Sequence, residues 1–327
     1  MDNTKHRDKS IDVLRFVATL LIFNHLAGRF FGGMTFLATG GVLGCALFFF
    51  CSGYTLSFGS LDRFDLWYRR RLSRIWPTCI MSVLLLEVLG FQGGVMLSLK
   101  GCGWFVECIL IYYAIYWMSK RLLCLNEFFV LLLSVLVDFI AYFSCYQIDE
   151  PGVVIWGDGY FRWIHYFTIF IFGSYVAQCR KRQSSLWKDV VGFFVSVVLF
   201  YGYFFEASKS MMMTRLQIIN IVQLMGFVFF AYRIASCNRM QRFMELRMVA
   251  NVVLAIGGLS LEMYLIGKTL VAYWPVLPFP IGYVIALVLT LVSAYGVRTM
   301  GRAFAQTITP TYYKTGYDWK RILALLP

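Results

Sequence analysis

Residues 11–25 read Ile-Asp-Val-Leu-Arg-Phe-Val-Ala-Thr-Leu-Leu-Ile-Phe-Asn-His, an apolar stretch that carries Asp12, Arg15 and His25. The stretch continues to about residue 30 and is therefore long enough for a membrane-spanning helix. An ionisable side chain in the hydrocarbon core costs on the order of 2.5–3.5 kcal/mol, so such side chains are usually retained for pairing or for function. This helix is therefore the first place to look for a site.

The composition of the whole chain indicates an all-α polytopic membrane protein. Of its 327 residues, 60% are hydrophobic and 14% are charged, and the mean hydropathy is +0.69. Soluble domains contain only about 45–50% apolar residues. Apolar runs predict about ten membrane helices, at about residues 11–30, 37–58, 75–93, 104–119, 127–145, 161–178, 189–206, 215–232, 249–273 and 281–299. The ninth run, residues 249–273, is long enough to tilt or break at Gly257 and Gly258.

Lysine and arginine are unevenly distributed between the predicted connections. If the amino terminus is cytoplasmic, 23 of the 30 Lys and Arg fall on the cytoplasmic side, six fall on the other side, and Arg15 lies within the first helix. The positive-inside rule then places both termini in the cytoplasm. We expect a membrane domain over residues 1–300, located in the cell (inner) membrane and surrounded by its lipids, and a cytoplasmic tail on the membrane surface over residues 301–327.

The net charge of +13 reflects this orientation, and nucleic-acid binding is not expected of so apolar a chain. The nine cysteines form no C-x-x-C pair and the chain has three histidines, so we expect neither a disulfide framework nor a metal site.

Two further segments carry polar groups suited to a ligand. Residues 48–57 read Phe-Phe-Phe-Cys-Ser-Gly-Tyr-Thr-Leu-Ser, where small residues permit close helix packing and Ser52 adds a hydroxyl. Five arginines follow between residues 63 and 74. Arginine is suited to bidentate phosphate contacts, so a cytoplasmic phosphorylated ligand fits this cluster, as do anionic lipid headgroups.

The order of these motifs resembles the membrane acyltransferase 3 family. The resemblance covers residues 11–299 and implies an enzyme that transfers an acetyl or similar group from cytoplasmic acetyl-CoA to a hydroxyl of a surface polysaccharide or other glycan. It implies no permanently bound cofactor, because acetyl-CoA is a substrate. The segments that carry it are Ile-Asp-Val-Leu-Arg with a later His in the first helix, Phe-Phe-Cys-Ser-Gly-Tyr-Thr-Leu-Ser in the second, Arg71 and Arg74 before Ile75-Trp76-Pro77, and Ser260 to Ile266.

The resemblance also implies roles for individual residues. The family's essential Arg and His correspond to Arg15 and His25, and its donor-associated R-x-x-R corresponds to Arg71 and Arg74. We expect Asp12 and Glu262 to join the catalytic group, and Arg69, Arg70 and Ser52 to contribute to acyl-CoA binding.

This sequence departs from the family pattern at two positions. Gly267 stands where members often have a His, and nine residues separate Arg15 from His25 where members usually have ten. At about 100° per residue, His25 then lies about 80° from the helix face of Arg15. Either a local bulge restores the alignment or the two groups do not act as a pair.

The chemistry assigns the clearest role to His25. Acyl transfer to an alcohol requires a base for the hydroxyl proton, and an imidazole with an unperturbed pKa near 6.5 is suited to that task; His25 is equally able to carry the acetyl group transiently. Arg15, about 15 Å along the helix, suits the CoA end or an ion pair with Asp12.

Three alternatives stay open. His25 has the sequence context of a structural histidine bonded to a backbone carbonyl. The chain is compatible with a transporter or flippase of a lipid-linked glycan, in which no covalent chemistry occurs. The shortened Arg15 to His25 spacing is also compatible with a family member that has lost catalysis.

Overall fold

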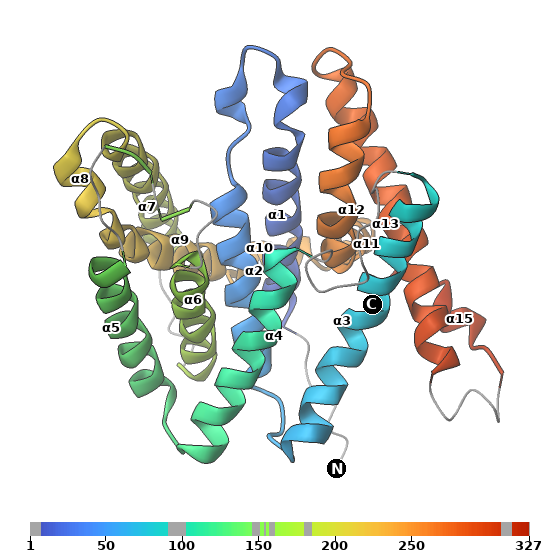
Figure 1. The fold of residues 1–327 in the computed structure, drawn as a ribbon, viewed down its shortest axis with the longest axis horizontal. Coiled ribbons are helices and arrows are strands. Elements are labelled where there is room, and N and C mark those ends of the chain that lie inside the picture. Colours follow the sequence, from blue (N-terminus) through green and yellow to red (C-terminus); the bar gives the residue numbers. More distant parts are fainter. Residues whose placement is uncertain are drawn as a thin grey trace. The chain divides into compact units, whose positions relative to one another are not determined.

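The computed structural model describes residues 8–90, 103–145, 151–153, 155–156, 161–179, 185–308 and 316–326. Within these ranges all regular elements are helices, and there is no β-strand (Figure 1). The helices are α1 Lys9–Leu26, α2 Gly41–Leu56, α3 Phe64–Val88, α4 Trp104–Trp117, α5 Glu127–Cys145, α6 Phe161–Gln178, α7 Leu186–Ala207, α8 Met211–Arg215, α9 Asn220–Ala235, α10 Asn238–Phe243, α11 Arg247–Gly258, α12 Ser260–Tyr273, α13 Ile281–Thr307 and α15 Trp319–Ile322.

Several of these helices have the length and composition of membrane spans. Five segments are long and apolar enough, namely Lys9–Phe31, Glu127–Ser144, Leu186–Ala207, Gln217–Ala235 and Ile281–Thr307, and α11 with α12 makes a sixth if the bent pair is one span. The expected all-α membrane class is therefore confirmed. Each of the predicted apolar ranges overlaps a helix, while the total of ten spans and the cytoplasmic placement of the termini remain predictions.

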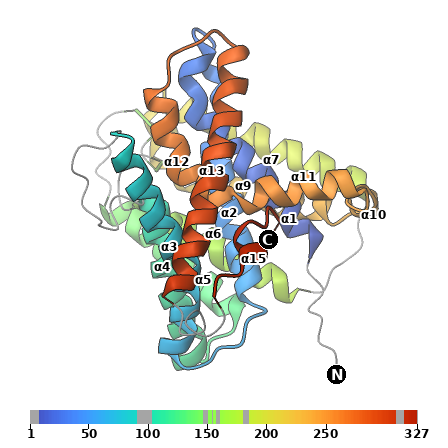
Figure 2. The same cartoon turned by 90° about the vertical axis from the view of Figure 1, so that its right-hand side faces the viewer.

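The ninth apolar run is broken, as expected from its glycines. Helices α11 and α12 meet at an angle of 62°, with Gly258 and Leu259 at the junction. Figure 2 shows the change of direction between the two helices. A side chain at position 258 would approach Nη1 of Arg298 to 3.0 Å, so glycine leaves room for this guanidinium at the bend.

The predicted start of the third helix is wrong. Helix α3 begins at Phe64 instead of about residue 75, so the arginine cluster lies on a helix and not in a loop. Hydropathy detects only the apolar part of this helix. Its first turns are rich in Arg and Leu, both of which favour the helical conformation.

The chain divides into two compact units. Unit 1 comprises Met1–Leu14, Cys45–Ser60 and Tyr116–Arg247, and unit 2 comprises Arg15–Gly44, Leu61–Ile115 and Met248–Pro327. Helices α1 and α2 therefore each contribute to both units.

In unit 1, helices α2 and α6 pack at very short range. A Cβ atom at Gly53 would lie 1.8 Å from the carbonyl oxygen of Phe170, and one at Gly173 would lie 2.2 Å from that of Phe50. Glycine is thus required on both helices, and the Ser-Gly segment of α2 serves close helix packing as expected.

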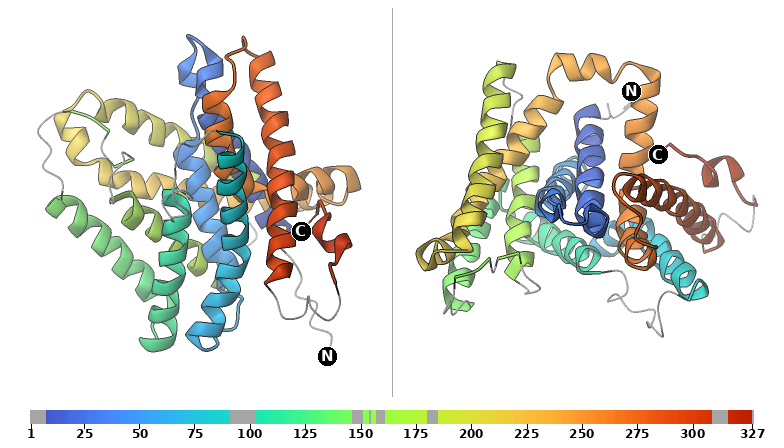
Figure 3. Two further views of the ribbon diagram at one scale, coloured as in Figure 1. Left: turned by 45° about the vertical axis from the view of Figure 1, so that its right-hand side comes forward. Right: turned by 90° about the horizontal axis from the view of Figure 1, so that it is seen from above.

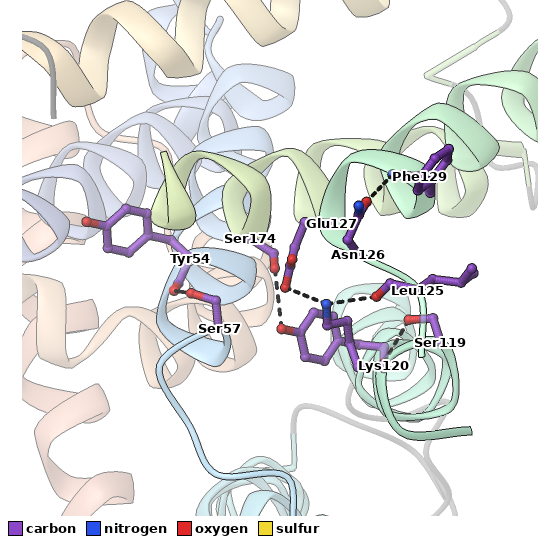
Figure 4. A network of polar contacts seen from close by, with 10 residues as sticks. Tyr54, Ser57, Ser119, Lys120, Leu125, Asn126, Glu127, Phe129 and Ser174 are labelled. Carbon is purple, nitrogen blue, oxygen red and sulfur yellow. Dashed lines mark hydrogen bonds and ion pairs between the residues drawn. The ribbon is translucent and has the colours of Figure 1, made fainter. Parts of the chain in front are cut away.

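A polar network joins the end of α4 to the start of α5 in unit 1 (Figure 4). Lys120, in the π-helical turn Met118–Leu122, lies 2.9 Å from Oε1 of Glu127 and donates to the carbonyl of Leu125 at 2.8 Å. The ammonium group thereby pairs with the charge of a buried carboxylate and binds a carbonyl of the connection between the turn and α5.

In unit 2, the end of α1 packs against α12 and α13. Phe23, Ala27 and Phe30 form an apolar cluster together with Leu259, Met263, Val271, Ala286 and Ala294. Arg29 lies in the 3-10 helix Ala27–Phe31 and donates to the carbonyls of Val271 and Ala272 at the end of α12. An arginine at a helix C-terminus satisfies free carbonyls and complements the helix dipole.

A second apolar cluster of unit 2 joins α3, α4 and α12. Its buried members are Cys79, Val83, Val106, Leu110 and Leu265. Tyr68 adds a polar contact by donating to the carbonyl of Leu110 at 3.4 Å. The arginine-bearing helix is therefore anchored to α4 and α12 along one side.

Candidate active site

His25 lies in the last turn of α1, where the chain leaves the helix. Its neighbour Asn24 donates from Nδ2 to the carbonyls of Leu37 and Thr39, at 2.7 and 3.0 Å. Nδ1 of His25 lies 3.2 Å from the carbonyl oxygen of Ala38. Three consecutive carbonyls of the connection to α2 are thus bound by two side chains of α1.

The bond to Ala38 determines which ring nitrogen of His25 carries the proton. A carbonyl oxygen only accepts, so Nδ1 must donate, and in the neutral ring Nε2 then holds the lone pair. The ring is exposed, and among the described residues no hydrogen-bond partner reaches Nε2. The carbonyl bond fits the structural alternative for His25, whereas an open, basic Nε2 is what a general base requires.

The start of α2 lies against the imidazole of His25. A Cβ atom at Gly41 would come within 2.7 Å of Cδ2 and Cγ of His25. Glycine at this position therefore lets the first turn of α2 contact the ring directly. Together with the Ala38 carbonyl, this contact fixes the ring orientation.

Arg15 does not share a helix face with His25. Helix α1 is α-helical from Lys9 to Leu26 without a bulge, so the two side chains stay about 80° apart around the axis and about 15 Å apart along it. The structure therefore favours separate roles for the two groups.

The arginines of α3 divide between two faces of this helix. At about 100° per residue, Arg70, Arg71 and Arg74 fall within about 100° of one another, on the side of Trp67, and Arg69 falls on the other side. The guanidinium of Arg71 lies 4.6 Å from the centre of the buried Trp67 ring, a cation–π contact.

The partners of these arginines differ. Arg70 pairs with Asp62. Arg69 and Arg74 are exposed, and no acceptor among the described residues binds them. Burial lowers the pKa of Arg71, Tyr113 counteracts this, and Arg74 and Arg70 lower the pKa further because their positive charges are close. The result is a group of like charges on one helix face, which favours a polyanion.

Glu262 lies in the first turn of α12 and is 6% exposed. Its Oε2 atom has no hydrogen-bond partner within the described ranges. Arg298 and Arg302 of α13 are the cations that act on it electrostatically. A buried carboxylate beside two arginines is a charged cluster. The sequence alone places Arg298 and Arg302 among the basic residues that follow the last predicted span, where they fit the positive-inside rule.

The structure thus separates the predicted site residues into two groups. His25, Arg15, Arg69, Arg70, Arg71, Arg74 and Glu262 belong to unit 2. Asp12 and the buried Ser52 belong to unit 1. The contacts of His25 with Ala38 and Gly41 were missed from the sequence, where the paired glycines 40 and 41 were the available signal.

Comparison with known proteins supports the assignment that these residues suggested. A family model described as an acyltransferase domain, acyltransferase 3, matches residues 8–299. No curated protein and no solved structure matches the chain significantly. The match extends from the first described residue through most of α13 and includes every predicted site residue. The chain therefore belongs to the membrane acyltransferase 3 family.

Proposed function

We propose that this acyltransferase moves an acetyl or similar group from acetyl-CoA to a hydroxyl of a surface polysaccharide or other glycan. His25 is the general base, and the arginines of α3 bind the phosphates of the donor. The acceptor is engaged from the outer side of the cell (inner) membrane and the donor from the cytoplasm.

The observation that carries this proposal is the state of the His25 ring. Its Nδ1 is bound by the Ala38 carbonyl at 3.2 Å, which leaves Nε2 basic, and the ring is exposed at the end of a membrane helix. Purely structural histidines do not require an open nitrogen. A base held in one tautomer needs no reorganisation before proton transfer.

In the proposed reaction, the acceptor oxygen attacks the thioester carbon while its proton moves to Nε2 of His25. The tetrahedral intermediate then collapses, the C–S bond breaks, and the thiolate takes the proton from the imidazolium. The products are the O-acyl glycan and free CoA, so no external oxidant or base is consumed.

The donor is proposed to bind through its phosphates at α3. Arg70, Arg71 and Arg74 share one face, and Arg74 has no acceptor in the described part of the structure. Charge-assisted contacts from arginine to phosphate are stronger than neutral hydrogen bonds. Arg15, on a different face of α1 from His25, is proposed to bind the CoA end of the donor.

The test uses purified protein in lipid nanodiscs, with acetyl-CoA and a soluble oligosaccharide acceptor. Acceptor-dependent CoA release and O-acetyl product are measured by mass spectrometry. The His25→Asn variant is the sharpest comparison, because its side-chain amide keeps a donor for the Ala38 carbonyl but removes the basic nitrogen. Equal turnover by the two proteins would exclude His25 as the base.

The same experiment separates the acyltransferase from both alternatives. A transporter or flippase would release no CoA, with or without acceptor. A family member that has lost catalysis would give the same result although it still binds CoA. Acceptor-dependent release that requires His25 is expected only of the acyltransferase.

A further inference from the structure

The far half of α13 carries polar side chains along one stripe. Tyr295, Arg298, Arg302 and Gln306 follow one another at intervals of three or four residues and therefore share a helix face. Gly301, within this stretch, approaches Thr78 of α3 so closely that a Cβ atom would lie 3.1–3.2 Å from it. Helix α13 therefore packs against α3 at Gly301, about one helical turn beyond Arg74, and the stripe lies about 100° round α13 from this contact.

The C-terminal segment, residues 317–326, folds back onto this stripe. Figure 2 shows α15 beside the far half of α13, and the left panel of Figure 3 shows the same two helices turned by 45° from the view of Figure 1. Tyr295 donates to the carbonyl of Leu323 at 2.9 Å, and Gln306 accepts from the backbone N–H of Asp318 at 2.9 Å. Ile322 is buried.

Both arginines of the stripe bind backbone carbonyls of the segment. Nη1 of Arg302 donates to the carbonyls of Arg321 at 3.2 Å, of Ile322 at 3.4 Å and of Ala324. Nη1 of Arg298 donates to the carbonyl of Leu325 at 3.4 Å. Carbonyl oxygens satisfy the hydrogen-bond donors but supply no formal negative charge.

The charges in this cluster do not balance. Arg298 and Arg321 both act electrostatically on Arg302, and Glu262 is the one carboxylate that does so among the described residues. Arg298 is only 7% exposed. Glu262 can balance the charge of only one of the two α13 arginines, so an anionic ligand would bind the other more strongly than the carbonyls do.

We propose that Arg298 and Arg302 form a phosphate-binding site, and that the C-terminal segment 317–326 is a displaceable cover whose carbonyls occupy it when no phosphate is bound. The phosphate belongs either to coenzyme A or to an anionic lipid headgroup, since both offer the same group. The first source rests on the proposed function; the second does not.

The test measures release of the segment by trypsin cleavage after Arg321, with full-length protein in phosphatidylcholine nanodiscs. Cleavage requires the segment to leave α13, because Ile322 is buried against it. The released peptide is quantified by mass spectrometry and normalised to cleavage at Arg242, an exposed residue of α10. One arm adds free coenzyme A; a second adds no ligand but replaces about a third of the lipid with phosphatidylglycerol.

We expect cleavage to be about fivefold faster in one of the two arms. Acceleration by coenzyme A would identify the donor as the source of the phosphate, and acceleration by phosphatidylglycerol would identify the lipid headgroup. Arg302→Gln should be cleaved about fivefold faster than wild type without ligand and should not respond to either phosphate. Tyr295→Phe, which weakens the cover but keeps both arginines, should be cleaved faster and still respond.

No acceleration in either arm, or a wild-type response in Arg302→Gln, would overturn the proposal. The readout is independent of catalysis, so His25→Asn should respond as wild type does. A response without acetyl transfer would therefore contradict the proposed function alone, and transfer without a response would contradict this inference alone.

Discussion

Two histidines of the membrane helices, His25 in unit 2 and His165 in unit 1, show what distinguishes a candidate base from a structural ring. Nδ1 of His165 lies 2.7 Å from Oδ2 of Asp138, and both side chains are fully buried. The ring packs edge-on against Trp156 and is tilted against Phe161. His25 has a backbone carbonyl in place of the carboxylate, and its ring is exposed.

The comparison shows that an unpartnered ring nitrogen alone does not identify a site. Nε2 lacks a partner at both rings within the described residues. At His165 this nitrogen is buried, whereas the ring of His25 is exposed. The exposure of the ring, more than the hydrogen-bond partner of Nδ1, distinguishes His25 from His165.

The largest expected effect concerns the base itself. His25→Asn should lower kcat about 100- to 10,000-fold, the usual contribution of a general base, while thermal stability stays close to wild type because the bond to Ala38 is retained. CoA release and calorimetric unfolding of the same preparation measure the two quantities. An active His25→Asn protein would exclude His25 as the base and make His165 the histidine of the membrane helices to test next.

The second test concerns the buried pair of His165 and Asp138 in unit 1. Asp138→Leu leaves Nδ1 of His165 without its partner and should lower the free energy of unfolding by about 1.5–3 kcal/mol. Asp138→Asn retains an acceptor and is the matched control, with a smaller loss. Thermal unfolding in nanodiscs checks both, and the folded fraction of each should keep its turnover. Loss of turnover at full stability in Asp138→Leu would give His165 a catalytic role.

A smaller effect is expected from the neighbour of the His25 ring. Gly41→Ala places a methyl group within 2.7 Å of the imidazole and should lower kcat about tenfold by displacing it, with KM unchanged. Gly33→Ala is the control, because nothing lies within 4 Å of a Cβ atom there. Unchanged turnover in Gly41→Ala would show that the ring position is not limiting.

The smallest effect is expected at the arginine cluster. Arg74→Gln should raise KM for acetyl-CoA about three- to fivefold and leave kcat unchanged, since an exposed charge contributes at most about 1 kcal/mol. Arg63→Gln is the control, because Arg63 is also exposed but pairs with Asp65. Steady-state kinetics of the three proteins separate donor binding from the chemistry at His25.

The sequence was sufficient for the class of the fold and for the family, because apolar length and motif order are properties of the chain itself. It also located the break at Gly258, since glycine weakens a long helix. It misplaced the start of α3, where a charged but helix-favouring segment continues an apolar one. The contacts of His25 with Ala38 and Gly41 depend on how the connection between α1 and α2 folds back, which local patterns do not encode.

Helix α12 is held at both of its ends. Arg29, four residues after His25, donates hydrogen bonds to the carbonyls of Val271 and Ala272 at the end of α12. Glu262, in the first turn of α12, interacts with Arg298 and Arg302, the arginines that bind the C-terminal segment. Helix α12 has 14 residues and is about 21 Å long, so it is a rigid connection between these two sets of contacts. A displacement of the Glu262 end of α12, near Arg298 and Arg302, must therefore have one of two results. Either the whole helix moves and displaces Arg29 and the segment that follows His25, or the bend before Ser260 changes its angle and absorbs the movement.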